Sequence, residues 1–137
     1  MNIRWTQRFQ NFQKAQLNFQ EMINLLRGDY NNKAYKMATI QGFEVSTELA
    51  WKLIKDYLNY LQFNVQSPRD AIKQAFSIEL INDGIVWISM IEDRNLTSHI
   101  YDENRTNEII KKIDELYFAK LVELENIFKH KLSEINE

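Results

Sequence analysis

The chain has no cysteine, only one proline and three glycines, and only two histidines among its 137 residues. Without cysteine it can form no disulfide, thiolate nucleophile or cysteine-based zinc site. His99 and His130 are too few for a rich metal site, so we expect neither a metal nor a cofactor. The scarcity of proline and glycine argues against linkers, low-complexity segments and most β-architectures.

Excess charge and long apolar runs are also missing. The net charge is −2 and the pI is about 5.8, so the chain lacks a basic field that attracts nucleic acid non-specifically. Any contact with RNA must therefore be local. No stretch approaches the ~20 apolar residues of a membrane span, and residues 1–13 lack the apolar run of a signal peptide. We therefore expect a cytoplasmic protein with no membrane contact and a single domain over residues 1–137.

Helical periodicity is present along almost the whole chain. Apolar residues spaced by three and four predict four long helices, at about 5–26, 33–61, from 85 into the polar segment around 93–101, and from 104 onward. Ser67-Pro68 predicts the start of a short helix, because serine can cap a helix and proline suits its first position. The sequence therefore predicts an all-α fold, an antiparallel up-and-down four-helix bundle with one additional short helix at about 67–80.

The chain is rich in aromatic residues, with eight Phe, six Tyr and three Trp. Most of them fall on the apolar stripes of the predicted helices, which favours a role in core packing. Trp51 and Trp87 lie off the main stripe of their helices. A second apolar stripe on a bundle helix often marks a partner surface, so we expect both residues to contribute to a homodimer interface.

Glu44, Glu48 and Lys52 follow one another at four-residue spacing on the second predicted helix. This pattern predicts a solvated face with one Glu-to-Lys pair. Acid–base chemistry by the paired carboxylates is an alternative that requires their burial. His130, near the end of the last helix, is interpreted as a complement to the helix dipole.

The segment from 93 to 101 gathers polar groups that a helical bundle does not require. In chain order they are Arg94, Asn95, Ser98, His99 and Tyr101. Arginine offers a fork of donors to phosphate oxygens, histidine moves protons near neutral pH, and asparagine can orient either group. These residue types suit a phosphodiester, with Arg94, Asn95 and His99 as candidate catalytic residues. Ser98 and Trp87 are weaker candidates for binding.

Helical geometry separates the candidate catalytic residues. At ~100° per residue, Asn95 and His99 fall ~40° apart, whereas Arg94 and His99 fall ~140° apart. One straight helix therefore does not bring Arg94 and His99 together. Either the helix ends near Thr97 and the chain turns His99 back, or the same residues of a second subunit complete the site.

The same residues also permit a purely structural interpretation. Arg94 can form an ion pair with a neighbouring acid, and His99 can be an ordinary polar residue with satisfied hydrogen bonds. The neighbouring acids are Asp93, Asp102 and Glu103. They also lower the local positive potential that an RNA-binding groove requires.

Several short segments stand in a characteristic order along the chain: Gly42-Phe43-Glu44, Glu48-Leu49-Ala50-Trp51-Lys52, Ser67-Pro68-Arg69, Asn82-Asp83-Gly84, Trp87 and the run from Asp93 to Glu103. Together they resemble the nucleotidyltransferase substrate-binding-protein family of the HEPN superfamily, close to the HepT-like toxins. This resemblance implies an antiparallel four-helix bundle, usually homodimeric. It also implies a separate small nucleotidyltransferase as the partner, which acts as the antitoxin in toxin–antitoxin pairs.

In the toxin branch of this family, the pattern Arg-x4-His-x-Tyr marks a metal-independent ribonuclease site, and Arg94, His99 and Tyr101 match it. The resemblance implies that His99 is a general acid or base, that Arg94 stabilises charge on phosphorus and that Asn95 holds the reacting groups. It implies that Tyr101 is the hydroxyl that the partner enzyme adenylylates. One alternative is a non-catalytic subunit that presents a nucleotide or other substrate to the transferase. Another is a helical partner protein whose polar segment only forms an interface.

Overall fold

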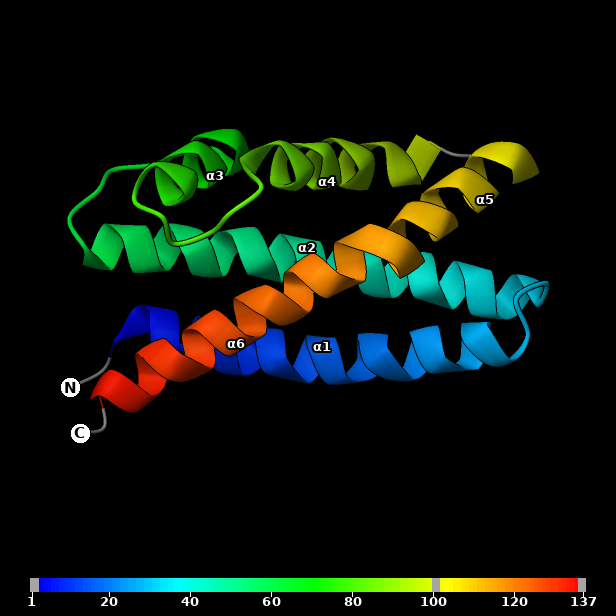
Figure 1. Cartoon of the computed structure of the whole chain (residues 1–137), viewed down its shortest axis with the longest axis horizontal. Helices are drawn as coiled ribbons and strands as arrows, with labels where there is room; N and C mark the ends of the chain where they lie inside the picture. The colour runs from blue at the N-terminus through cyan, green and yellow to red at the C-terminus, as the bar shows by residue number, and fades with distance from the viewer. Residues whose placement is uncertain (1–2, 100–101, 136–137) are drawn as a thin grey trace.

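The computed structural model describes residues 3–99 and 102–135, and all regular structure in these ranges is helical (Figure 1). The α-helices are α1 (Arg4–Gly28), α2 (Lys33–Tyr60), α3 (Pro68–Ser77), α4 (Gly84–Leu96), α5 (Glu103–Lys112) and α6 (Phe118–Ile135). Two short elements complete the set, the 3₁₀ turn η1 (Thr97–His99) and the π-helical segment η2 (Ile113–Tyr117). Because η2 joins α5 to α6 without a break, these three elements form one long final helix.

The long helices alternate in direction along the bundle. Figure 1 shows α1 and α2 side by side and antiparallel, α4 running back along α2, and the final helix crossing the pair diagonally. The short helix α3 lies beside α2 and leads into α4. Both termini lie at one end of the bundle, and the C-terminal end of α4 meets α5 at the other. The predicted all-α bundle with one additional short helix is confirmed.

Helices α1 and α2 approach each other closely at Gly42. A Cβ atom at this position would come within 2.8 Å of the ring of Phe19. Only glycine allows this contact without displacing the ring. Further along the same interface, the Arg8 Nε atom donates a hydrogen bond of 2.7 Å to the buried Asp56 carboxylate. These contacts fix the register of the two longest helices.

The helix α3 starts as predicted and ends earlier than predicted. The Ser67 hydroxyl accepts a hydrogen bond of 3.1 Å from the Asp70 backbone, and Pro68 occupies the first turn. The helix ends at Ser77 because Glu79 has a left-handed backbone conformation, with φ of 61°. The Leu80 N–H then bonds the Ala75 carbonyl at 2.9 Å, which closes a Schellman cap. The expected end near residue 80 is therefore corrected to Ser77.

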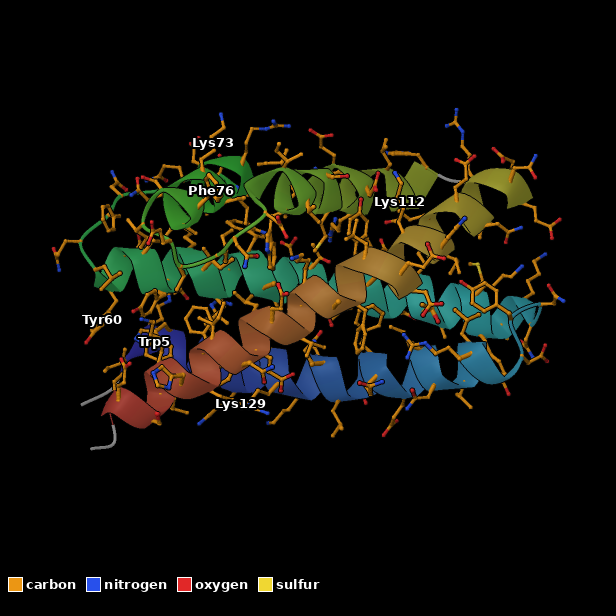
Figure 2. The ribbon with its side chains drawn as sticks, in the orientation of Figure 1. Trp5, Tyr60, Lys73, Phe76, Lys112 and Lys129 are labelled. Carbon is orange, nitrogen blue, oxygen red and sulfur yellow. The ribbon has the colours of Figure 1, made fainter. Side chains whose placement is uncertain are left out.

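An aromatic cluster fills the core at the end where the termini lie. The ring of Phe128 is 5.6 Å from that of Trp5, 5.2 Å from that of Tyr57 and 6.0 Å from that of Phe9. Figure 2 shows Trp5 at this end, with Tyr60 nearby. The expectation that the aromatic residues pack in the core is confirmed for these four rings.

The two tryptophans expected at a partner surface differ in burial. Trp87 is only 2% exposed and belongs to the core, so its predicted place at a homodimer interface is wrong. The reason is that Trp87, Met90 and Ile91 form the buried face of α4, whereas Ile85, which the apolar spacing placed on the main stripe, is 88% exposed. Trp51 is half-buried on α2, and the Nζ atom of Lys55 lies 5.9 Å from its ring centre.

Candidate functional site

Arg94 continues the buried stripe of α4 at the point where the core opens to solvent. Trp87, Met90 and Ile91 form this stripe and are buried. Arg94 follows at helical spacing, so its side chain faces α2, where its Nε atom lies 3.6 Å from a carboxylate oxygen of Glu48. The Arg94 side chain is 33% exposed. Position 94 therefore continues the core-facing side of α4, and an arginine occupies it with its side chain half-buried.

The end of α4 explains the exposure of the residues that follow. The Thr97 hydroxyl donates a hydrogen bond of 2.7 Å to the Arg94 carbonyl, and the chain tightens into the turn η1. Thr97 is buried, whereas Asn95, Ser98 and His99 are exposed. The helix therefore ends at Leu96, as the first of the two alternatives, a chain turn near Thr97, requires.

A second face of α4 makes a polar network with the final helix. The Tyr117 hydroxyl donates to the Asp93 carboxylate and lies 2.8 Å from the Ser89 hydroxyl. The Lys112 Nζ atom is 3.4 Å from the same carboxylate. Burial, and next the hydrogen bond to Asp93, raises the pKa of Tyr117 well above its usual value of 10.0. Tyr117 therefore stays a neutral hydrogen-bond donor, and its ring stacks on Phe43 at 5.5 Å.

An open cleft of about 410 Å³ lies between the end of α4 and α5. Its lining residues are Asp93, Leu96, His99, Arg105, Glu108, Ile109 and Lys112. His99 thus shares the cleft with two permanent cations and two carboxylates. Figure 2 shows Lys112 on α5, close to the C-terminal end of α4. The arrangement can hold a polar, charged group beside an exposed imidazole.

The acidic residues around the segment have structural partners of their own. Asp102 caps α5, because its side chain accepts a hydrogen bond of 2.8 Å from the Arg105 backbone. Glu103 lies in the first turn of α5, where a negative charge suits the helix dipole. Asp93 bonds Tyr117 and Lys112. The acid found beside Arg94 is instead Glu48, from a different helix.

Arg94 and His99 lie on different sides of α4. Arg94 faces α2, whereas His99 lines the cleft with α5, and Arg94 does not line that cleft. No contact joins the two side chains within residues 3–99 and 102–135. Tyr101, the predicted regulatory residue, lies outside the described residues. The turn at the end of α4 therefore does not by itself assemble the predicted site.

Sequence reasoning missed three participants in this region. Glu48 was predicted to pair with Lys52, which is confirmed at 3.4 Å, but its second contact with Arg94 was not expected. Tyr117 and Lys112 were also missed. Tyr117 is 24 residues from its partner Asp93, and no local spacing connects the two. The only available signal was the position of Asp93 on the same helical face as Ser89.

Two further geometric observations concern the described part of the chain. No group of three or more His, Asp or Glu side chains there is arranged to hold a metal ion. None of its helices combines the length and apolar character that crossing a lipid bilayer requires.

The protein is a helical bundle, and at one end of the bundle a histidine and several charged side chains line an open cleft. The model of the family described as nucleotidyltransferase substrate binding protein like matches residues 7–130. The chain therefore belongs to this family. Its description implies association with a nucleotidyltransferase.

The proteins similar to this chain include one named as a probable ribonuclease and one of known crystal structure. One is a Haemophilus influenzae protein named "Probable ribonuclease HepT", which is 29% identical over 93 residues. That match covers 64% of this chain and 64% of the relative. The other is a Thermus thermophilus protein of known crystal structure, 24% identical, with a TM-score of 0.70 over 92% of this chain and 99% of that chain. The second similarity supports the fold alone.

Proposed function

We propose that this protein is a metal-independent RNA endonuclease, the toxin of a pair whose antitoxin is a separate small nucleotidyltransferase, and that it acts in the cytoplasm. The observation that carries the proposal is the exposed His99 in an open cleft with Arg105 and Lys112. Histidine supplies a proton donor or acceptor near neutral pH, and Arg105 and Lys112 can contact phosphate oxygens although two carboxylates balance their charge in the cleft. The similarity to a protein named as a ribonuclease supports the same reaction.

In the proposed reaction, the 2′-hydroxyl of a ribose attacks the adjacent phosphorus. A bond forms between the 2′ oxygen and phosphorus, the bond from phosphorus to the 5′ oxygen of the next nucleotide breaks, and a cyclic phosphate remains. His99 accepts the proton of the 2′-hydroxyl while water protonates the departing 5′ oxygen, or His99 protonates that oxygen while water accepts the 2′ proton. Arg94 stabilises the negative charge that develops on the phosphoryl oxygens, and Asn95 orients the reacting groups.

The partner transferase is proposed to control this activity at Tyr101. Transfer of AMP from ATP to the tyrosine hydroxyl, with release of pyrophosphate and of the hydroxyl proton, adds a bulky, negatively charged group two residues after His99 in the sequence. Such a group excludes an RNA phosphate from the neighbouring cleft by size and by charge repulsion. The toxin is then silent while the modification persists.

We further propose that two copies of the chain form a homodimer and complete each other's sites. The separation of Arg94 and His99 on two sides of α4 supports this arrangement. On α4, Ile85 is 88% exposed and Leu96 is 56% exposed, so apolar surface is available for a contact between copies. A two-fold axis near α4 then allows Arg94 of one protomer to act with His99 of the other.

Cleavage of RNA by the pure protein in excess chelator tests the reaction. His99→Ala and Arg94→Ala should each lower the cleavage rate by about 10²–10⁴-fold, because each removes a group that acts in the transition state. An RNA with a single 2′-deoxy substitution at the cleaved position should resist cleavage.

Two matched variants control for the loss of a histidine or an arginine as such. His130→Ala removes the other histidine, which lies on α6 and pairs with Glu134 at 3.1 Å. Arg4→Ala removes an arginine on α1 whose side chain is 79% exposed. Both should cleave RNA at the wild-type rate. Intact RNA after incubation with pure wild-type protein, or equal cleavage by His99→Ala, contradicts the endonuclease function.

Subunit mixing tests whether the site is shared. Purified Arg94→Ala and His99→Ala proteins are inactive separately, and each retains the residue that the other lacks. After subunit exchange, half of the dimers are mixed and each contains one intact shared site, so activity should return to about a quarter of wild type. No recovery, with mixed dimers demonstrated by mass spectrometry, contradicts the shared site.

The family description favours a second candidate function, a non-catalytic subunit that binds a nucleotide for the transferase. In this case Arg94 and His99 bind phosphate and the protein leaves RNA intact. Calorimetric titration with ATP in the presence of the purified transferase should then give binding that Arg94→Ala weakens. No heat of binding with either ATP or the transferase excludes this function.

A further inference from the structure

The carboxylate of Glu48 forms ion pairs with two cationic side chains. Its Oε1 atom is 3.4 Å from the Nζ atom of Lys52, and its Oε2 atom is 3.6 Å from the Nε atom of Arg94. The side chains of Glu48, Lys52 and Arg94 are 33%, 39% and 33% exposed. All three therefore reach solvent where α2 meets α4. One carboxylate joins a surface lysine to the arginine of the proposed active site.

Glu48 contacts Arg94 at one edge of the guanidinium. The Arg94 Nε atom is buried and has no hydrogen-bond partner among the described residues, since 3.6 Å is an ion-pair distance. A contact at Nε does not occupy the two Nη groups, which can bind two oxygens of one phosphate. Glu48 can thus fix the direction of the guanidinium without using those phosphate-binding donors.

The charge balance of this group is positive. Two cations and one carboxylate leave a net charge of +1, in a chain whose net charge is −2. An ordinary helix pair behaves differently, because Lys129 and Glu125 on α6, 3.8 Å apart, neutralise each other. In the sequence, Glu44 lies four residues before Glu48 and Lys55 three residues after Lys52, so these two residues add one charge of each sign. Asp93, which precedes Arg94, pairs with Lys112.

We propose that Lys52 is a second phosphate-binding residue for RNA, and that Glu48 is a positioning residue that holds Lys52 and Arg94 on one side of the junction between α2 and α4. The inference rests on the proposed endonuclease function and adds substrate-binding residues to it. When the reacting phosphate of an RNA strand binds Arg94, a neighbouring phosphate of the same strand binds Lys52. Lys52 therefore contributes to RNA affinity, and Glu48 contributes to the cleavage rate.

RNA binding tests the role of Lys52. Binding is measured with a short fluorescent single-stranded RNA, using protein that also carries His99→Ala so that the RNA stays intact. Lys52→Gln should weaken binding about 3- to 10-fold and reduce the slope of log Kd against log salt by about 0.7, the value for one phosphate contact on a single strand. Loss of folded protein does not change this slope.

The matched control is Lys129→Gln. Lys129 is also a lysine four residues after a glutamate on a helix surface, and Figure 2 shows it on α6, on the side of the bundle away from α4. This variant should bind RNA with the parent affinity and the parent salt slope. Equal affinity and slope for Lys52→Gln and Lys129→Gln overturn the assignment of Lys52.

Single-turnover cleavage at saturating RNA tests the role of Glu48. Glu48→Gln should lower the rate about tenfold, because the guanidinium loses its fixed direction. The same variant, tested with His99→Ala, should bind RNA at least as tightly as its parent, because a negative charge beside two cations is removed. A purely structural role does not separate rate from affinity in this way. The control Glu125→Gln should change neither quantity.

Different results contradict the role of Glu48 and the endonuclease function. Wild-type cleavage by Glu48→Gln overturns the positioning role while the endonuclease function stands. No RNA binding by the His99→Ala protein, or no cleavage by the wild type, overturns the endonuclease function and the roles of Glu48 and Lys52 with it.

Discussion

The two ends of the bundle are held together by different interactions. At the end where the termini lie, the rings of Trp5, Phe9, Tyr57 and Phe128 pack against one another at 5.2 to 6.0 Å. At the opposite end, where α4 meets α5, charged and hydroxyl groups form a network beside the stacked rings of Phe43 and Tyr117. There the Asp93 carboxylate accepts from Tyr117 and Lys112, beside an open cleft.

The aromatic end therefore contributes mainly to the stability of the fold, and the polar end mainly to the positions of charged side chains. Apolar burial stabilises the fold without fixing the direction of any group. Hydrogen bonds and ion pairs contribute less net stability, but they have preferred geometry and so determine where a charged side chain lies. Substitutions in the aromatic cluster should therefore change the free energy of unfolding. Substitutions at the polar end should change the chemistry more than the stability.

The largest expected effect on stability is that of Phe128→Ala. Phe128 is fully buried among three other rings, and its truncation leaves a cavity in the aromatic cluster. The free energy of unfolding, measured with urea, should fall by about 3–5 kcal/mol. Cleavage per folded molecule, measured below the melting temperature, should stay at the wild-type value because the cluster lies at the end remote from the cleft.

Phe76→Ala is the matched control for this variant. Phe76 is on α3 and 53% exposed, so its truncation should cost less than about 1 kcal/mol. If both variants lose the same stability, the aromatic cluster has no special role. If Phe128→Ala lowers cleavage per folded molecule, the two ends are coupled.

Tyr117→Phe should have a smaller effect on stability and a larger one on function. The variant keeps the ring against Phe43 but leaves Asp93 without its hydroxyl donor, which should cost about 1–3 kcal/mol. Asp93 directly precedes Arg94, so the end of α4 loses a contact with the final helix. We expect RNA cleavage to fall about tenfold, because small misplacements of catalytic groups are costly. Unchanged cleavage contradicts a positioning role for this network.

Because the pKa of Tyr117 is raised, the contribution of this residue to stability depends on pH. The unfolded chain ionises this phenol near its usual pKa of 10.0, whereas the folded protein keeps it neutral to higher pH. The contribution of Tyr117 is therefore fully present below pH 10 and decreases as the pH rises further. Urea unfolding at pH 7 and at pH 11 should show a larger loss for wild type than for Tyr117→Phe. Equal losses contradict the assigned pKa shift.

Local sequence signals predicted most of the fold correctly. The spacing of apolar residues predicted the long helices, and Ser67 with Pro68 predicted the start of α3. The end of α3 was wrong because Glu79 adopts a left-handed conformation that its residue type does not suggest. The partner-surface prediction for Trp87 was wrong because α4 has apolar residues on several faces, and spacing alone does not determine which of these faces packs inward. The buried face contains Trp87, Met90 and Ile91, whereas Ile85 is exposed.

By itself, the sequence determined the helices, the Ser67 cap of α3 and the residue types gathered between 93 and 101. The reason is that periodicity and capping act over a few residues. Only the tertiary structure decided that Arg94 meets Glu48, that Tyr117 bonds Asp93 and that His99 lines a cleft with α5. These pairs join different helices, so their register depends on how the helices pack. Tyr117 lies in the π-helical segment η2, which no local pattern in the sequence predicted.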